Sequence, residues 1–269
     1  MRIARTYVLA FSCLFPVFPL FAQQTATTIT QSSPQAVALL QNSLAALTGG
    51  KPITDVTLSG NARRIVGPDD ESGTATLKAI SGDAGRMDLT LSSGQRSEIL
   101  NSTTTPPAGS WSGTDAVSHP IASHNLLNGS AWFFPVFAVS HRLSDSSFVA
   151  TYVGHETRNG QAVEHVTVSQ SSSVQTPPGV PTLQHLTQAD FFLDSTTLLP
   201  VAIAFNTHPD NDMILDIPVE IRFSDYRPVS GAQIPFHVEK FLNNTLLLDL
   251  QFTNAQLNSG LSASLFGAL

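Results

Sequence analysis

The feature that most constrains the fold is an alternation of apolar and polar residues in the last third of the chain. Between residues 189 and 257, four segments show this period-two pattern, and each is bounded by Pro, Gly, Asn or Asp. Because successive side chains of a strand point to opposite faces, the pattern predicts four consecutive antiparallel strands with one buried face. The four predicted strands cover residues 189–205, 218–234, 235–244 and 245–257.

Shorter alternating segments upstream predict more of the same sheet. Four of them are separated by Gly-containing turns and indicate an antiparallel meander that ends near Leu100. Two further segments flank Asn159-Gly160, a dipeptide typical of a tight hairpin turn. The meander segments are residues 55–66, 73–80, 86–91 and 98–100, and the hairpin strands are residues 148–154 and 161–170.

Two helices are predicted beside these strands. The first covers Pro34–Leu47, because Ser33 can cap its free amides, Pro34 suits the first helical position and Gly49-Gly50 ends it. The second covers Ala131–Leu143, the most apolar stretch after the N-terminus, for which a buried strand is the alternative. We expect both helices to bury an apolar stripe against the sheet.

The N-terminus has the pattern of a secretory signal peptide. A short basic start precedes an uncharged apolar stretch over residues 7–21, and cleavage is expected after Ala22. A membrane span is the alternative, but this stretch is shorter than the roughly 20 residues that a spanning helix needs. Cys13, the single cysteine, fits a lipidation motif poorly. We therefore expect an exported, periplasmic or extracellular protein without cysteine and without a stable membrane span.

Composition limits the domain organisation and the partners. The mature chain would carry 11 basic and 20 acidic residues, a net charge of −9. An acidic chain without basic clusters argues against a nucleic-acid partner. We predict a flexible polar lead over residues 23–32 and one β-rich domain over residues 33–269, with an irregular insertion, a loop or a sheet-edge excursion, at about 102–130.

Two blocks of sequence, residues 72–99 and 191–258, resemble the LolA-like superfamily of outer-membrane lipoprotein-sorting proteins. The first block has the early strands with an Arg and a Ser-Gly-Gln strand. The second has an Asp followed by Leu-Pro, then Asp-Tyr-Arg, Gly and Pro at the family's spacing. Together the blocks cover roughly half of the mature chain. The matching residues are Asp194, Leu199, Pro200, Phe223, Asp225, Tyr226, Arg227, Gly231, Pro235 and Asn254.

The resemblance implies an α+β fold in which a strongly curved antiparallel sheet forms a half-closed barrel. Its concave face would be apolar and covered by the two predicted helices. The carriers of that family hold acyl chains in this cavity, so a lipid or an acylated peptide is the ligand class that the resemblance implies. The sequence departs from the carriers in its greater length and in the insertion around residues 102–130.

No catalytic or metal-binding motif is evident in the sequence. It lacks a Gly-x-Ser-x-Gly elbow, a phosphate-binding loop and a His-Glu-x-x-His helix. The run His208–Asp212 lies close to Asp216 and gathers carboxylates, but it lacks the spacing and the distal Glu of a calcium loop. A solvated turn is the favoured interpretation. We therefore expect no metal site, no cofactor and no enzymatic activity.

The aromatic run around Pro135 is the best candidate for a ligand site. Trp132, Phe133, Phe134 and Phe137 either plug the sheet as core or form the lid or wall of an apolar pocket. The leading hypothesis is non-enzymatic binding of an apolar ligand in the concave face. The alternative is a structural or interaction module whose concavity is filled by its own side chains, and a hydrolase with an unrecognised site ranks last.

Overall fold

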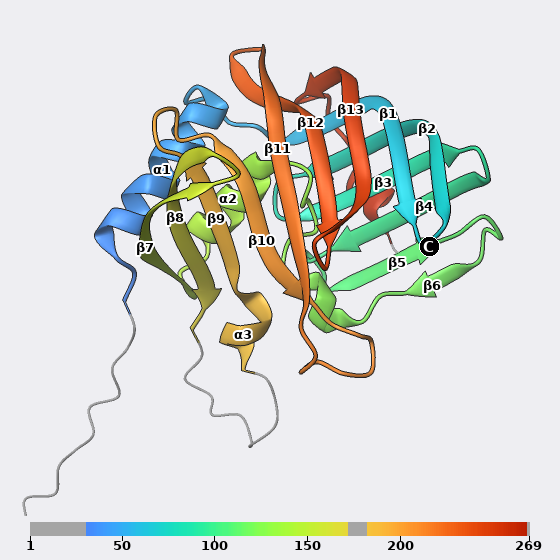
Figure 1. Ribbon diagram of the computed structural model, residues 1–269, viewed down its shortest axis with the longest axis horizontal. Coiled ribbons are helices and arrows are strands. Elements are labelled where there is room, and N and C mark those ends of the chain that lie inside the picture. Colours follow the sequence, from blue (N-terminus) through green and yellow to red (C-terminus); the bar gives the residue numbers. More distant parts are fainter. Residues whose placement is uncertain (1–30, 172–181, 268–269) are drawn as a thin grey trace, which may run out of the picture.

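One antiparallel sheet of 13 strands dominates the computed structural model, which describes residues 31–171 and 182–267 (Figure 1). The sheet is strongly curved and open, with β6 and β7 at its two ends. The predicted α+β class and the curved antiparallel sheet are confirmed. The strands are β1 (Asp55–Val66), β2 (Asp69–Ile80), β3 (Ala84–Leu91), β4 (Gly94–Asn101), β5 (Ala108–Ser112), β6 (Ser118–Pro120), β7 (Phe148–Arg158), β8 (Gln161–Gln170), β9 (Ala189–Asp194), β10 (Pro200–Thr207), β11 (Ile217–Val229), β12 (Ala232–Leu242) and β13 (Thr245–Leu257).

The chain builds this sheet from the centre outwards and then from the far end back to the centre. Strands β1 to β6 run in order from the middle to one end, and β7 to β13 return from the other end. The first and last strands pair with each other, with Val56 opposite Leu257 and Arg64 opposite Leu248. The pairing of β1 with β13 therefore joins two meanders into one sheet.

The C-terminal ladder contains five strands, so the prediction of four was wrong in one detail. Residues 189–205 form a hairpin of β9 and β10 and not a single strand. The Asp194 carboxylate accepts hydrogen bonds from the backbone N–H groups of Thr196 and Thr197, and Leu198 has a φ of 59°. An Asp side chain that captures nearby amides in this way favours a turn over a continuing strand.

The first helix, α1 (Pro34–Thr48), begins and ends as its sequence predicted. The Ser33 hydroxyl accepts a hydrogen bond from the Ala36 N–H, and Gly49 adopts a left-handed conformation with a φ of 60°. A Cβ at Gly49 would lie 2.4 Å from the Gly231 carbonyl oxygen, so a larger residue does not fit. Gly49 therefore both ends the helix and lets it approach the turn between β11 and β12.

The second helix, α2 (Pro135–Ser144), begins four residues later than predicted. Phe134 is extended, with φ −127° and ψ 94°, because the ring of a following proline disfavours helical geometry in the residue before it. Residues 131–134 consequently form a turn that leads into the helix. The structure also contains the short helices α3 (Leu183–Thr187), η1 (Ser123–Leu126) and η2 (Ala263–Phe266).

The region around residues 102–130 contributes to the sheet edge. Strand β5 pairs with β4, and β6 pairs with β5, so the sheet continues past the predicted meander. The predicted signal peptide and most of the polar lead lie outside the described residues. Within the described part of the chain, no helix is long and apolar enough to cross a membrane.

Candidate functional site

The concave face of the sheet is divided by the segment that leads into α2. This segment crosses β3 closely, since a Cβ at Gly85 would lie 2.1 Å from the Ser130 carbonyl oxygen. On one side of it, α1 packs against α2, β7, β8 and β12 (Figure 1). There the space is filled by side chains such as Leu40, Leu47 and Phe191, each at most 1% exposed. The helix-covered half of the concave face is therefore mostly packed core, with a pocket of about 230 Å³ left between α1, the end of α2 and strands β7 and β8.

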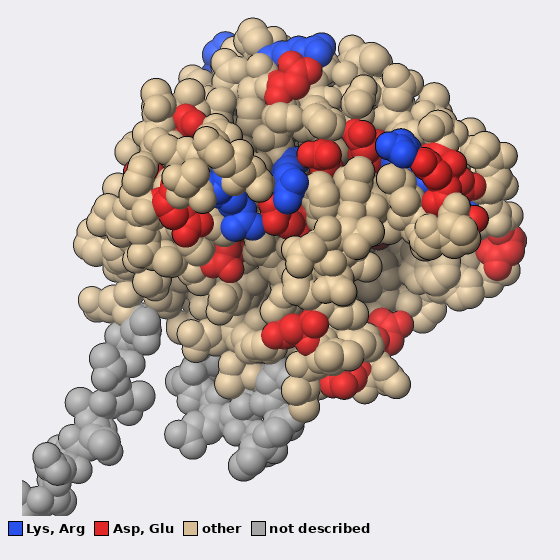
Figure 2. All heavy atoms as spheres, in the orientation of Figure 1, with Lys and Arg blue, Asp and Glu red and all other residues tan. Residues whose placement is uncertain are grey.

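The other half holds a groove, which we define by two adjoining pockets of about 210 and 300 Å³. The pockets share four lining residues on β4, β5, β12 and β13, so they form one continuous hollow. The surface is hollowed beside the turn between β12 and β13, and acidic side chains gather below this hollow (Figure 2). The shared residues are Glu98, Trp111, Lys240 and Leu247, and the apolar lining includes Met87, Leu89, Phe205, Leu242 and Leu248.

One wall of the groove carries two arginines that share a carboxylate. Arg64 Nη1 lies 3.4 Å from Glu71 Oε2, and Arg96 Nη2 lies 3.3 Å from the same oxygen. A hydrogen bond from the Ser93 hydroxyl and the positive charge of Arg96 hold the pKa of Glu71 below its ordinary value. Two guanidinium groups therefore share the ionised Glu71 carboxylate, and Glu98, two residues after Arg96 on β4, adds a second carboxylate to the lining.

The junction of the two pockets combines an aromatic ring with two charges. Trp132 Nε1 donates a hydrogen bond of 3.2 Å to Glu98 Oε1, and Lys240 Nζ lies 4.5 Å from the centroid of the Trp132 ring system. Trp111, which is 45% exposed, stacks on His119 with ring centroids 4.3 Å apart. The groove thus has an exposed aromatic side chain at its mouth and an ammonium group at its centre.

The four aromatic residues predicted as a lid or wall lie on the boundary between the two halves. Phe133, Phe134 and Phe137 are enclosed in the core, at 1%, 0% and 1% exposure, and the Phe134 and Phe137 rings meet edge to face. Trp132 lies in the same core cluster but also lines the groove. Trp132 therefore lies at the groove, and the three phenylalanines lie behind it in the core.

The other groove residues were not identified from the sequence. Glu98 and Trp111 are cross-strand partners on β4 and β5, whereas Lys240 comes from β12. Alternation within each strand shows which residues share a face, but only the register between distant strands brings these three together. The sequence did contain a signal for Lys240, because this residue occupies a position on the apolar face of its strand.

A second, wider cleft of about 670 Å³ lies between α1 and α2 and the turn that joins β2 to β3. Its lining includes Gln41 from α1, Ser140 and His141 from α2, and Lys51 from the segment after α1. The cleft shares no lining residue with the two pockets of the groove, so the two features are separate.

Comparisons with known proteins connect this fold to one superfamily. No protein-family model and no curated protein matches the sequence. A domain assigned as an outer membrane lipoprotein-sorting protein from Vibrio parahaemolyticus matches in structure with a TM-score of 0.56 and 11% identity, over 87% of this chain and 96% of that one. A DUF1329 family protein from Desulfovibrio piger matches with a TM-score of 0.53 and 10% identity, over 88% of this chain and 98% of that one.

A LolA superfamily protein from Nitrosomonas europaea gives a similar result. Its TM-score is 0.53 at 8% identity, and the match covers 86% of this chain and 96% of that one. At such identities the likeness concerns the fold alone, and the ligand has to be argued from the groove itself. The fold that the sequence resemblance implied is confirmed: this chain has the fold of the LolA superfamily and of outer-membrane lipoprotein-sorting proteins.

Proposed function

We propose that this protein is exported and binds a lipid or an acylated ligand, without catalysis, in the concave groove. The observation that carries the proposal is an uncovered apolar groove on an otherwise mostly packed concave face. The two pockets together reach the range of about 300–1,000 Å³ that is usual for small-molecule sites. The neighbours assigned to lipoprotein sorting share this fold and support the ligand class.

The floor of the groove suits an acyl chain. Leu248 and Leu89 are each 3% exposed and lie on the face that lines the groove, with Met87 and Leu247 beside them. Transfer of an alkyl chain from water to such a surface stabilises the complex by about 0.8 kcal/mol for each buried methylene. An extended chain that covers the floor therefore supplies most of the binding free energy.

The walls of the groove suit an anionic end on that chain. Among the described residues, no carboxylate lies within ion-pair distance of Lys240, whose ammonium instead packs over Trp132. The buried Nε of Arg96 also has no hydrogen-bond partner in that part of the chain. A carboxylate or phosphate at the end of the ligand would supply the missing acceptor.

The cellular location follows from the N-terminal pattern. We propose that residues 1–22 direct export and are cleaved after Ala22, which places the domain over residues 33–269 in the periplasm or outside the cell. Lipids and acylated proteins in that compartment need a protein surface to cover their chains in water. The groove offers such a surface to one chain at a time.

A pair of neighbouring leucine substitutions tests the proposal. Leu247→Trp places a large ring at the junction of the two pockets and should abolish binding of a fluorescent fatty acid to the mature protein. Leu246→Trp is the matched control, because Leu246 pairs with Phe241 on the opposite face of the sheet. Fluorescence titration measures both variants, and thermal unfolding checks that each is folded.

Two results would reject the proposal. One is a wild-type protein that binds no fatty acid and yields no lipid in native mass spectrometry after mild purification. The other is equal loss of binding in the two leucine variants, which would place the ligand elsewhere. The first result favours the alternative of an interaction module with a self-filled concavity.

A further inference from the structure

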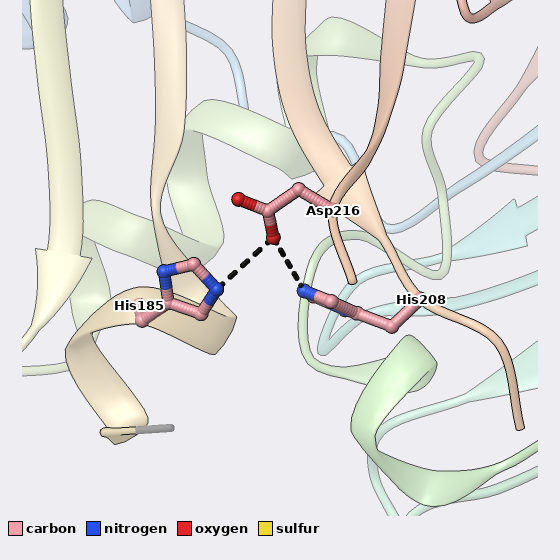
Figure 3. Close-up of side chains that lie close together, drawn as sticks. All are labelled: His185, His208 and Asp216. Carbon is pink, nitrogen blue, oxygen red and sulfur yellow. Dashed lines mark hydrogen bonds and ion pairs between the residues drawn. The ribbon is translucent and has the colours of Figure 1, made fainter. Parts of the chain in front are cut away.

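Three elements at the end of the sheet bring two histidines and an aspartate together (Figure 3). His185 lies on α3, His208 follows β10 directly, and Asp216 precedes β11. His208 and Asp216 enclose the loop between β10 and β11, whereas His185 comes from a helix 23 residues upstream of His208. No metal site was expected from the sequence, because the run His208–Asp212 lacks the ligand spacing of a calcium loop and no His-Glu-x-x-His helix is present. The contribution of His185 becomes visible only in the structure.

The ligand atoms of these side chains converge on one point. His185 Nε2 and His208 Nε2 each lie 3.0 Å from the same oxygen, Oδ1 of Asp216. All three atoms lie within 4.8 Å of one another, and the two imidazoles approach the carboxylate from different sides (Figure 3). Tetrahedral coordination at about 2.0–2.2 Å requires a similar clustering of donor atoms. A small outward shift of each donor would accommodate a metal ion between them.

The position of His208 is fixed by the surrounding structure. The side-chain oxygen of Asn125 accepts a hydrogen bond from the His208 N–H, and its Nδ2 donates to the His208 carbonyl oxygen. The His208 side chain is 1% exposed, whereas those of His185 and Asp216 are 40% and 41% exposed. One donor is thus held rigidly inside the protein and two remain open to solvent, so an ion can reach the site.

Unpartnered imidazole nitrogens surround the cluster. His208 Nδ1 and His124 Nε2 are both buried and have no hydrogen-bond partner among the described residues. The His124 ring lies 5.9 Å from the His208 ring, and the His185 ring lies 5.7 Å from it on another side. Two further imidazoles and one carboxylate therefore lie around the buried His208 side chain, and two of the imidazole nitrogens make no hydrogen bond to a described residue.

We propose that His185, His208 and Asp216 form a binding site for a divalent transition-metal ion of the zinc class. Two imidazole nitrogens and one carboxylate oxygen are the donor set that such ions favour, whereas calcium and magnesium take mainly oxygen ligands. Three protein donors leave one coordination position open to water. The ion would fasten α3 to the loop between β10 and β11, and this loop carries Asp210 on the rim of the groove.

Zinc titration of the mature, chelator-treated protein by isothermal calorimetry tests the site. We expect one zinc ion to bind per chain and to raise the midpoint of thermal unfolding, because an ion that binds only the folded state stabilises it. Magnesium and calcium at the same concentrations should produce neither effect. An absence of stoichiometric zinc binding by the wild-type protein would overturn the proposal.

Substitutions at the two exposed donors distinguish this site from adventitious binding. His185→Gln and Asp216→Asn keep side-chain size, and each should weaken zinc binding by about 100-fold. His155→Gln is the control, since His155 is an exposed histidine that also pairs with a carboxylate, that of Glu164, but stands outside the cluster. Equal zinc affinity in His185→Gln and in His155→Gln would show that the cluster does not hold the ion.

Discussion

The two halves of the concave face belong to one sheet, but one half is packed beneath helices and the other holds an open groove. Strand β12 crosses both, and its concave-side residues Ile234 and Val238 are fully buried beneath α1 and α2. Further along the same face, Lys240 and Leu242 line the groove. The sheet therefore provides one continuous apolar surface, and the segment from Ser130 into α2 decides where that surface is filled and where it stays open.

This difference shows that a ligand groove can arise from incomplete covering. The helix-covered half receives three phenylalanines from the α2 segment, which fill the space that the curvature of the sheet creates. The open half is lined by no residue of α1 or α2, receives only Asn125 from the short helix η1, and carries polar groups on its walls. Core packing and binding would then be separable by mutation, and four predictions examine that separation.

The largest effect is expected in the filled half. Phe134→Ala removes a fully buried ring, so the free energy of unfolding in urea should fall by roughly 3–5 kcal/mol. Fatty-acid affinity of the protein that remains folded should change little, because the ring lies behind Trp132. A loss below about 1 kcal/mol, combined with weakened binding, would instead make Phe134 part of a movable lid.

The next effect concerns the junction of the two meanders, where the start of β1 meets the chain that follows β13. Burial raises the pKa of Asp55, but hydrogen bonds from Ser259 and from the Gly260 N–H outweigh it and leave the pKa below the ordinary 3.8. A carboxyl group whose pKa is lower in the folded than in the unfolded protein stabilises the fold fully at pH values above its pKa in the unfolded protein. This stabilisation is lost as the pH falls through its pKa in the folded protein. Asp55→Asn should therefore cost about 2 kcal/mol at pH 7.

That cost should depend on pH. The free energies of unfolding of the wild type and of Asp55→Asn can be measured in urea between neutral pH and pH values below 3.8. We expect the difference between them to shrink as the wild-type carboxylate is protonated. A difference that stays constant across this range would mean that lost packing, and not charge, explains the effect.

A smaller effect is expected in the open half. Lys240→Met keeps the length of the side chain and removes its charge, so affinity for a fatty acid should fall about tenfold, or about 1.4 kcal/mol. Affinity for the uncharged alcohol of the same chain length should stay the same. Lys78→Met is the control, because Lys78 alternates with the buried Leu77 and lies on the other face of the sheet. Equal losses for acid and alcohol would contradict an electrostatic role.

The smallest effect is spectroscopic. The chain has two tryptophans: Trp111 is 45% exposed at the groove, and Trp132 is 3% exposed at the boundary. A ligand that covers Trp111 should shift the protein's emission to shorter wavelength, and Trp111→Phe should remove most of that shift while changing stability by less than about 0.5 kcal/mol. A full shift in Trp111→Phe would place the ligand against Trp132 instead.

The elements that were predicted correctly from the sequence are those that depend on local patterns. Alternation predicted most strands, Ser33 and Gly49 located the ends of the first helix, and Asn159-Gly160 marked a hairpin turn that the structure contains between β7 and β8. The resemblance supplied the curvature of the sheet. The start of α2 was predicted too early. The apolar residues before Pro135 were given more importance than the restriction that a proline places on the backbone of the residue before it.

The groove and the histidine cluster depend on contacts between distant segments. Lys240 meets Trp132, and His185 meets His208, only after the register of the whole sheet is set. No spacing rule in a single sequence relates residues on different strands and loops in this way. The aromatic run was recognisable as a candidate, whereas the charged side chains that complete the groove were not.

The pairing of the first strand with the last determines when this protein can fold. During synthesis β1 emerges before β2 to β12, and residues 245–257, which cover its free edge, emerge only after all of these strands. Until then the early meander exposes an unpaired edge that can join strands of other chains. Such a long-range closure slows folding and makes it dependent on β13. A polypeptide with this topology becomes a finished sheet only when residues 245–257 have paired with β1 and β12.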